Sequence, residues 1–436
     1  MKYDVSKLGI EFLNPMQQEM LQMARRERQL VLLSPTGSGK TLAYMLPLLQ
    51  LMDSQKDTLQ ALVLVPSREL AIQTVSVVKR LCSEARVLAC YGGRPAMDEH
   101  RQINGLRPHL IVATPGRILD HIHKQNINPA SVSNLVIDEF DKCLELGFQE
   151  DMEAIIRELT SVDRRILLSA TDCPSIPDFV GTKDYCRLSY LDEDEPCSDR
   201  ISVQYVLSPE KDKLATLKRL LCTLGVQKSL VFANHRQSVE RIGSYLAQEG
   251  IMADVFHGGM EQRDRERALY RFMNGSRNVF VCTDLGSRGL DIPDVDNIIH
   301  YHLPIDEESY IHRNGRTARW ENVGNAYLLL GPEEKLPEYV QLTEGEFVLP
   351  SKQPLPSLPI WATIYVGKGK KDKISRGDIL GFLTKIGGLE GQQIGRIDVL
   401  PNWSYVAVQR SAVKSLLLRI KGQKIKGIKT IFALAD

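Results

Sequence analysis

Residues 30–41 read LVLLSPTGSGKT, an apolar run that leads into a glycine-rich loop and then into the helix-forming stretch LAYMLPLLQ. The apolar run predicts a buried strand. Glycines in such a loop let backbone N–H groups approach phosphate oxygens, and the N-terminus of the helix adds a favourable dipole. Lys40 would neutralise phosphate oxygens, and the Thr41 hydroxyl would hold Mg²⁺. The predicted phosphate loop consists of Ser34, Pro35, Thr36, Gly37, Ser38, Gly39, Lys40 and Thr41.

The strand–helix pattern around this loop recurs along most of the chain. Further apolar strands are expected at 61–66, 86–92, 110–114, 134–138 and 165–170, with a helix over 67–81. A second set follows at 229–234, 252–258, 278–284, 297–303 and 325–331. Apolar strands separated by helices indicate parallel sheets covered on both faces. The sequence therefore predicts two α/β domains, over residues 1–190 and 200–340.

Two interruptions mark expected linkers. The acidic stretch LDEDEPCSD (191–199) separates the two α/β patterns, and residues 341–359 are rich in proline. Its end, 348–359, has four prolines in twelve residues, which predicts a semi-rigid extended tether. A short α+β pattern follows over 360–436. Residues 361–436 hold 14 Lys and Arg against 5 Asp and Glu, whereas the whole chain carries a net charge of only +1. This asymmetry indicates a polyanion-binding module.

Composition limits the class of protein. Hydrophobic residues make up 43% and charged residues 25%, as in globular proteins, and no apolar run approaches the roughly 18 residues that span a bilayer. The first residues lack the pattern of a signal peptide. The eight cysteines form no C-x-x-C pair, which favours free thiols in a reducing compartment. We expect a cytoplasmic protein with no membrane contact.

Acidic and basic motifs complete a candidate nucleotide site. Asp138 follows an apolar strand, where it would hold Mg²⁺ together with Thr41, and Glu139 would orient and deprotonate an attacking water. Acidic turns after strands are common, so this motif gains its meaning from the phosphate loop. The segment HRNGRTAR (312–319) places three arginines at three-residue spacing. They form either a solvated basic face or arginine fingers that stabilise phosphoryl charge.

In this order the motifs resemble those of the DEAD-box RNA helicases, over roughly residues 10–335. The resemblance implies two tandem RecA-like domains that bind ATP, Mg²⁺ and RNA together, with Lys40, Asp138, Glu139, Arg316 and Arg319 as catalytic residues. It assigns adenine recognition to Gln17 and further nucleotide contact to Asp291. It assigns coupling of hydrolysis to strand separation to Asp141, Ser169, Thr171 and His312. It implies RNA contacts for Pro66, Arg68, Gly92, Gly93, Thr114, Pro115, Gly116, Arg117, Gln262, Arg265 and Thr283.

One departure from the family pattern bears on activity. Phe140 stands where the family usually has alanine, which puts a ring beside the Mg²⁺ turn and would alter the contact of Asp141 with Ser169 and Thr171. The catalytic carboxylates, lysine and arginines are all kept, so we expect an active RNA-stimulated ATPase. Two alternative functions remain. One is an RNA-binding scaffold that is clamped by ATP and hydrolyses it weakly, and the other is a DNA translocase built on a related core.

Residues 360–436 resemble the RNA-recognition-like domain of the DbpA group of bacterial helicases. The companion aromatic-rich strand of such a sheet is lacking, so base stacking on the sheet is not expected. Loop lysines are better candidates for RNA phosphates, unless they form only a solvated basic surface: Lys368, Lys370, Lys371, Lys373, Lys424, Lys426 and Lys429. The resemblance implies a structured hairpin of large-subunit ribosomal RNA as target, and a role in ribosome assembly. We expect a monomer.

Overall fold

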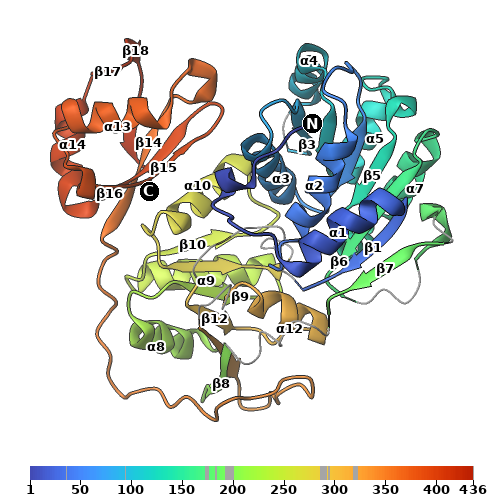
Figure 1. Ribbon diagram of the computed structural model, residues 1–436. Coiled ribbons are helices and arrows are strands. Elements are labelled where there is room, and N and C mark those ends of the chain that lie inside the picture. Colours follow the sequence, from blue (N-terminus) through green and yellow to red (C-terminus); the bar gives the residue numbers. More distant parts are fainter. Residues whose placement is uncertain are drawn as a thin grey trace. The chain divides into compact units, whose positions relative to one another are not determined.

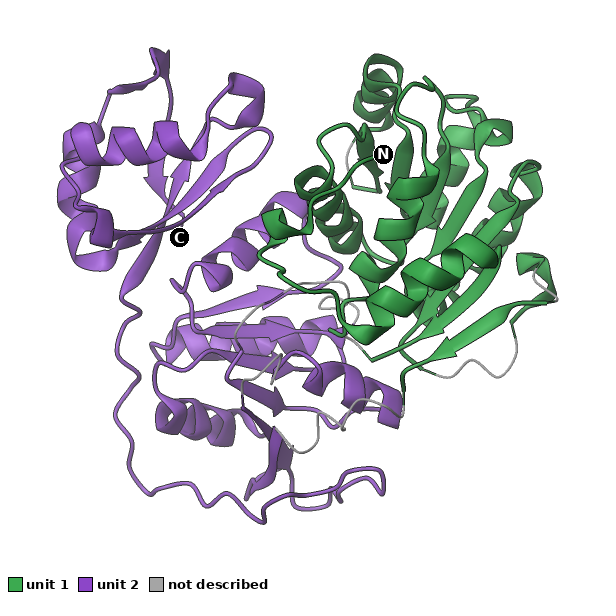
Figure 2. Cartoon of the chain, viewed as in Figure 1, with its two compact units in different colours: residues 1–197, 288–291 green, residues 198–287, 292–436 purple. Residues whose placement is uncertain are grey.

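The computed structural model describes residues 1–35, 37–93, 95–171, 176–181, 184–191, 201–284, 292, 295–317 and 323–435. The chain forms two compact units, residues 1–197 with 288–291 and residues 198–287 with 292–436 (Figure 2). Each unit has its own sheet and its own hydrophobic core. The linker expected at 191–199 lies almost wholly outside the described residues.

The first unit is built on a seven-stranded parallel sheet. Its strands are β1 (Gln29–Leu33), β2 (Ala61–Leu64), β3 (Val87–Cys90), β4 (Leu110–Ala113), β5 (Asn134–Ile137), β6 (Arg164–Ser169) and β7 (Cys186–Ser189). They lie in the order β3-β4-β2-β5-β6-β1-β7, and every pair is parallel. Six strands are those the sequence predicts. The edge strand β7 was missed because its alternation of buried and exposed residues is short.

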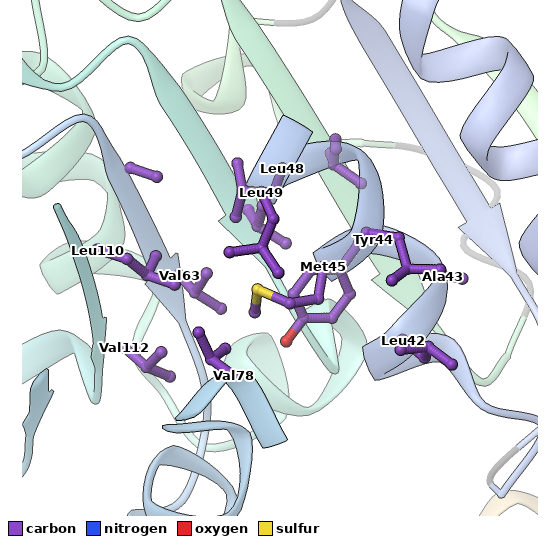
Figure 3. Close-up of a cluster of buried hydrophobic side chains, with 14 of the residues drawn as sticks. Leu42, Ala43, Tyr44, Met45, Leu48, Leu49, Val63, Val78, Leu110 and Val112 are labelled. Carbon is purple, nitrogen blue, oxygen red and sulfur yellow. The ribbon is translucent and has the colours of Figure 1, made fainter. Parts of the chain in front are cut away.

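Helices cover both faces of this sheet. They are α1 (Pro15–Arg26), α2 (Lys40–Leu51), α3 (Arg68–Leu81), α4 (Ala96–Leu106), α5 (Pro115–His123), α6 (Phe140–Glu145) and α7 (Gln149–Glu158) (Figure 1). Alternate residues of β2 enter opposite cores, Val63 one and Leu62 the other. Figure 3 shows Met45 and Leu49 of α2 directed toward Val63. This packing fixes the start of α2, and with it the phosphate loop.

The second unit repeats this plan with six strands. They are β8 (Ile201–Leu207), β9 (Ser229–Phe232), β10 (Ala253–Phe256), β11 (Val279–Cys282), β12 (Asn297–His300) and β13 (Gly324–Leu330), in the order β10-β11-β9-β12-β13-β8. All their pairings are parallel. Its helices include α8 (Leu214–Leu224), α9 (Arg236–Gln248), α10 (Gln262–Met273) and α12 (Glu307–Asn314). The two predicted parallel α/β sheets are confirmed; strand β8 was missed.

A small α+β domain with its own core ends the second unit. Its antiparallel strands β14 (Trp361–Val366), β15 (Ile394–Val399), β16 (Ser404–Gln409) and β19 (Phe432–Leu434) lie in the order β15-β16-β14-β19. Helices α13 (Arg376–Lys385) and α14 (Val413–Ile420) supply the other half of the core, where Leu383 and Leu416 meet Ile364 and Val406. A hairpin, β17 (Lys424–Ile425) and β18 (Ile428–Lys429), projects from it.

The other face of this antiparallel sheet packs on the second α/β domain. Tyr405 is 1% exposed, and its ring stacks on Tyr270 of α10 with centroids 5.4 Å apart. The Thr363 and Ser276 hydroxyls are hydrogen-bonded, and the Arg410 guanidinium donates to the Ser276 carbonyl oxygen at 3.3 Å. Tyr405 and Thr363 on this face are therefore covered by the second α/β domain, whereas Trp361 and Tyr365 are partly buried.

The segment before β14 is held along the second α/β domain. The Thr343 hydroxyl accepts a hydrogen bond from Val203 N at 2.7 Å, and Phe347 N donates to the Tyr205 carbonyl oxygen at 2.8 Å. The Arg219 guanidinium donates to the Pro350 carbonyl oxygen at 3.0 Å. The tether predicted at 348–359 is thus anchored at its start. No described helix is long and apolar enough to cross a membrane.

Candidate functional site

The phosphate loop lies between β1 and α2, as its sequence predicts. Gly37 and Gly39 have φ values of 90° and 95°, which L side chains rarely adopt. The Lys40 ammonium donates to the carbonyl oxygens of Ser34 and Pro35, the latter at 2.8 Å. Thr41 follows in the first turn of α2, and Thr36 lies outside the described residues. Gly37 and Gly39 therefore adopt backbone conformations that a larger residue would strain.

Gln17 lies directly against the phosphate loop. Its Oε1 accepts a hydrogen bond from Asn14 N at 3.1 Å, which forms a capping box at the start of α1, while its Nε2 donates to the Gly39 carbonyl oxygen at 3.4 Å. A Cβ atom on Gly39 would lie 2.5 Å from Gln17 Nε2. Asn14 Nδ2 also donates to the Ser38 carbonyl oxygen at 2.9 Å. Gln17 therefore helps to fix the conformation of the phosphate loop.

The acidic motif follows β5, close to the phosphate loop. Asp138 is buried, and its Oδ1 accepts a hydrogen bond from Glu139 N at 3.0 Å. Burial raises the pKa of Asp138, while the nearby Lys40 ammonium lowers it. Glu139 has φ 50° and caps α6. The oxygen of Asp138 and the hydroxyl of Thr41 are the hard donors that Mg²⁺ prefers, so these residues fit that ion.

Phe140, which precedes Asp141, is buried in the core. Its ring is 2% exposed and packs in the core beneath the sheet with Ile137 and Leu167. The Thr171 hydroxyl still donates to Asp141 Oδ2 at 3.2 Å, and Ser169 Oγ accepts from Thr171 N at 3.1 Å. The hydrogen bond between Thr171 and Asp141 is therefore present with Phe140 in place, because the ring points into the core.

The segments expected to contact RNA in the first unit also lie together. The Arg68 guanidinium covers Gly92 and Gly93, where a Cβ on Gly93 would lie 2.3 Å from an Arg68 nitrogen. Thr114 N donates to the Cys90 carbonyl oxygen at 3.1 Å, which joins the ends of β3 and β4. Pro115 begins α5, and Gly116 is exposed. The side chain of Arg117 is only 12% exposed and points to Glu99, which lies 3.4 Å away.

Strand order divides the motifs of the first unit into two groups. The carboxyl ends of parallel strands share one edge of the sheet. At this edge β3, β4 and β2 lie side by side, followed by Gly92–Gly93, Thr114–Arg117 and Pro66–Arg68. Strands β5, β6 and β1 form the other half, which bears the acidic motif, the coupling motif and the phosphate loop. The residues predicted to bind nucleotide and those predicted to contact RNA therefore lie on separate halves of one sheet edge.

In the second unit Arg313 and Arg316 do not lie on one continuous helix. Helix α12 ends at Asn314, so Arg316 follows the helix, where it is 5% exposed. Arg319 and Asp291 lie outside the described residues. His312 is mostly buried, with its Nε2 3.4 Å from the Glu308 carboxylate.

Arg313 is the first of the three arginines, and the family resemblance assigned it no role. In the structure it forms several hydrogen bonds. Its side chain is 1% exposed and donates to both Asp284 oxygens at 2.6 and 2.7 Å. It also donates to Asn234 Oδ1 and to the His302 carbonyl oxygen, both at 2.8 Å. Burial first, and then the charge of Arg313, lower the pKa of His300 to about 3. The spacing of the arginines carried no sign that the first one faces inward.

The other predicted RNA contacts of this unit lie on α10 and after β11. Gln262 is in the first turn of α10, and its Nε2 is hydrogen-bonded to Glu266 at 3.4 Å. Arg265 is buried, with its guanidinium 4.8 Å from the centre of the Phe256 ring. Thr283 is also buried.

Some loop lysines of the last domain form ion pairs with carboxylates, and others are exposed to solvent. Lys368 Nζ lies 2.8 Å from Asp372, and Lys426 Nζ bridges Asp378 at 3.2 Å and the Lys373 carbonyl oxygen at 3.0 Å. Lys370, Lys371, Lys424 and Lys429 are exposed. The Lys426 bridge joins loop 370–373 to the β17–β18 hairpin, so the two segments that carry these lysines lie next to each other.

This arrangement agrees with three family models. They are the DEAD/DEAH box helicase over residues 14–176, the helicase conserved C-terminal domain over 212–321, and the DbpA RNA binding domain over 363–432. The ATP-dependent RNA helicase DbpA of Escherichia coli (strain K12) is 34% identical over 433 residues, covering 97% of this chain and 94% of that protein. The chain belongs to the DEAD-box helicase family. It is an ATP-dependent RNA helicase by class, with a DbpA-type RNA-binding domain.

A second DbpA protein and two solved structures are also similar to this DEAD-box helicase. DbpA of Bacillus subtilis (strain 168) is 31% identical over 460 residues, covering 96% of this chain and 94% of that protein. Among solved structures, Mss116p bound to ssRNA and AMP-PNP is 25% identical, with a TM-score of 0.67 over 76% of this chain and 72% of that one. The fold of S. cerevisiae Dbp5 bound to RNA and ADP BeF3 is also similar, with a TM-score of 0.69 at 24% identity, over 76% of this chain and 86% of that one.

Proposed function

We propose that this helicase locally unwinds or remodels structured ribosomal RNA of the large subunit during ribosome assembly, driven by ATP hydrolysis. The observation that carries the proposal is the DbpA RNA binding domain, whose exposed lysines lie on loop 370–373 and the adjoining β17–β18 hairpin, while part of its sheet face is covered. Ammonium groups on loops bind phosphates as point charges and read the shape of a folded RNA. The domain would therefore hold the enzyme beside its substrate.

We further propose roles for the residues of the nucleotide site. Lys40 would bind phosphate oxygens, and Thr41 and Asp138 would hold Mg²⁺, which supplies charge neutralisation on the phosphoryl group when bound. Glu139, next to Asp138, would orient and deprotonate the attacking water. Arg316 and Arg319 would stabilise the transferred charge, and Gln17 and Asp291 would contact the nucleotide. The buried, Lys40-facing position of Asp138 supports this assignment.

The track along the RNA backbone is proposed from both units. In the first unit Pro66, Arg68, Gly92, Gly93 and the segment 114–117 lie on one half of the sheet edge. In the second unit Gln262, Arg265 and Thr283 would continue it. Hydrolysis would be coupled to strand separation through Asp141, Ser169, Thr171 and His312; the Thr171–Asp141 hydrogen bond supports the first of these links.

The cellular location and the oligomeric state are also proposals. Free thiols persist in a reducing cytoplasm, and Cys82, Cys90, Cys143, Cys186, Cys222 and Cys282 are all free. We propose that the enzyme works there as a monomer, which size-exclusion chromatography with light scattering would test.

The test is the steady-state ATPase activity of the full chain with no nucleic acid, a generic RNA, an equal-length DNA and ribosomal RNA. We expect ribosomal RNA to stimulate most, and the Lys370→Ala/Lys371→Ala/Lys424→Ala variant to lose that preference while generic RNA still stimulates it. Point variants are preferable to a truncation at residue 350, because removing the last domain would uncover Tyr270. Equal stimulation by ribosomal and generic RNA would contradict the proposed target, and equal stimulation by DNA would favour a DNA translocase.

A further inference from the structure

A buried polar cluster lies behind the RNA-contact half of the first sheet edge. At its centre is Glu99 of α4, whose side chain is completely buried. Glu99 Oε1 accepts a hydrogen bond from Tyr91 N at 3.1 Å. Its Oε2 lies 2.9 Å from His121 Nε2 and 3.4 Å from the Arg117 guanidinium. A carboxylate inside a protein core requires such partners, because burying an unpaired charge is very unfavourable.

The hydrogen bonds around His121 define its protonation. Asn126 Nδ2 lies 2.9 Å from His121 Nδ1, and an amide nitrogen can only donate. Nδ1 therefore accepts, Nε2 carries the proton, and the neutral ring donates to the Glu99 carboxylate. The assignment is self-consistent, because an ionised carboxylate only accepts. The Arg117 guanidinium, 3.4 Å from Glu99 Oε2, adds positive charge beside this carboxylate.

The same atoms could be considered as a cation site. Ligand atoms of Cys90, Glu99 and His121 all lie within 4.8 Å of one another. However, both His121 nitrogens and both Glu99 oxygens already have hydrogen-bond partners, so a cation would have to displace them. The geometry favours a closed hydrogen-bond network over a metal site.

The network joins two segments that are far apart in sequence. Tyr91 directly precedes Gly92 and Gly93, over which the Arg68 guanidinium lies. Arg117 belongs to the first turns of α5, immediately after Thr114. One carboxylate thus fixes both the loop after β3 and the start of α5, while it holds the Arg117 side chain inward, at 12% exposure.

We propose that Glu99 is a positioning residue for RNA binding: it holds the Gly92–Gly93 loop and the 114–117 segment in the geometry that receives the RNA backbone. The proposal rests on the RNA-contact role proposed above for those two segments. Glu99 itself touches no RNA, since it is buried. Arg117 acts mainly through Glu99, because its guanidinium faces the carboxylate. Preorganised contacts cost little ordering on binding, so loosening them weakens RNA affinity without touching the nucleotide site.

The test is Glu99→Gln in the full chain. The glutamine amide would place its N–H₂ group either at the Oε1 position, against the Tyr91 N–H, or at the Oε2 position, against the His121 N–H and the Arg117 guanidinium, so at least one donor faces another donor. We expect the RNA concentration for half-maximal ATPase stimulation to rise by about tenfold, with kcat at saturating RNA, the KM for ATP and the RNA-free rate changed less than about twofold. Anisotropy of a labelled single-stranded RNA, with a non-hydrolysable ATP analogue, should show the same loss.

A matched control separates positioning from simple electrostatics. Asp98 is next to Glu99 on α4, but its side chain is 59% exposed. Asp98→Asn removes the same charge and should leave RNA affinity unchanged or slightly raise it, because removing a negative charge favours RNA. A tenfold loss in Glu99→Gln therefore has the opposite sign to any direct charge effect. Glu99→Asp, which keeps a carboxylate, should recover part of the affinity.

Three results would overturn the proposal. One is a folded Glu99→Gln protein, with unchanged thermal unfolding, whose RNA affinity stays within about twofold of the wild type. Another is parallel loss of the RNA-free rate and ATP affinity, which would mean that Glu99 only stabilises the domain. If Glu99→Gln does not fold, His121→Gln tests the same network, and unchanged RNA affinity there would overturn it. Wild-type protein that RNA neither binds nor stimulates would instead refute the proposed function itself.

Discussion

Arg313 offers the clearest test of how the second unit is built. The perturbation is Arg313→Met, which keeps an unbranched side chain but removes the guanidinium. Arg313 is 1% exposed and makes two charge-assisted hydrogen bonds to Asp284, one to Asn234 and one to the His302 carbonyl oxygen. Breaking a buried ion pair costs about 3–5 kcal/mol. The Asp284 side chain is 20% exposed and can be partly rehydrated, so we expect the lower end, about 3 kcal/mol.

The assay must report the stability of the second unit alone, because a chain of several domains does not unfold in one step. Hydrogen exchange with mass spectrometry on peptides covering β9 and β12 reports the local free energy of opening. Asp284→Asn, which leaves the Asn234, His302 and His300 acceptors of Arg313 in place, should cost about 1–2 kcal/mol. The double variant should cost less than the sum of the two single variants, because the lost interaction is shared.

The refuting results are specific. An opening free energy in Arg313→Met within about 1 kcal/mol of wild type would show that Arg313 is not a structural hub. Loss of kcat with unchanged hydrogen exchange would mean that Arg313 acts on the phosphoryl group, as an arginine finger does. Because Arg313 also lowers the pKa of His300, its removal should raise that pKa, which NMR titration of the imidazole would follow.

Three further predictions concern other parts of the chain. Gly93→Ala should raise the RNA concentration for half-maximal ATPase stimulation by about tenfold, because φ is 89° and the added Cβ would displace Arg68. His300 has a pKa near 6.5 in the unfolded chain, whereas burial in the fold lowers its pKa to about 3. As the pH falls below 6.5, only the unfolded chain takes up this proton, so stability that is present at pH 8 is lost. The loss at pH 5 should be about 2 kcal/mol, measured by hydrogen exchange of β12. Tyr405→Ala should release the last domain from α10, seen as faster exchange of α10 amides, because about 3–5 kcal/mol of aromatic packing is lost.

Controls are available for each. Gly105→Ala adds a Cβ with nothing within 4 Å and should not change RNA dependence. His300→Gln cannot titrate, so its stability should vary less between pH 8 and pH 5 than that of the wild type; an equal variation would show that other groups dominate. Leu418 is 70% exposed on α14, so Leu418→Ala should leave α10 exchange unchanged. Unchanged α10 exchange in Tyr405→Ala would contradict the packed interface.

Local chemistry is what the sequence by itself determined. The glycine-rich loop, the acidic motif and the apolar strands are short contiguous patterns. The strands were predicted correctly because strand formation depends on neighbouring residues, and the loop and the acidic motif follow β1 and β5 as predicted. The basic surplus after residue 360 also identified the last domain without any structure. Strands β7 and β8 were missed because neither has a continuous apolar run bounded by clear turn residues.

Only the tertiary structure decided how these local pieces are combined. Strand order, set by crossovers between distant segments, puts the ends of β3, β4 and β2 together. It so separates the segments predicted to contact RNA from those predicted to bind nucleotide. The direction of a side chain is likewise non-local: Phe140 enters the core, Arg313 turns inward and Tyr405 covers α10. Glu99 gave no sequence signal at all, because its partners Tyr91, Arg117 and His121 meet only after β3, α4 and α5 have packed.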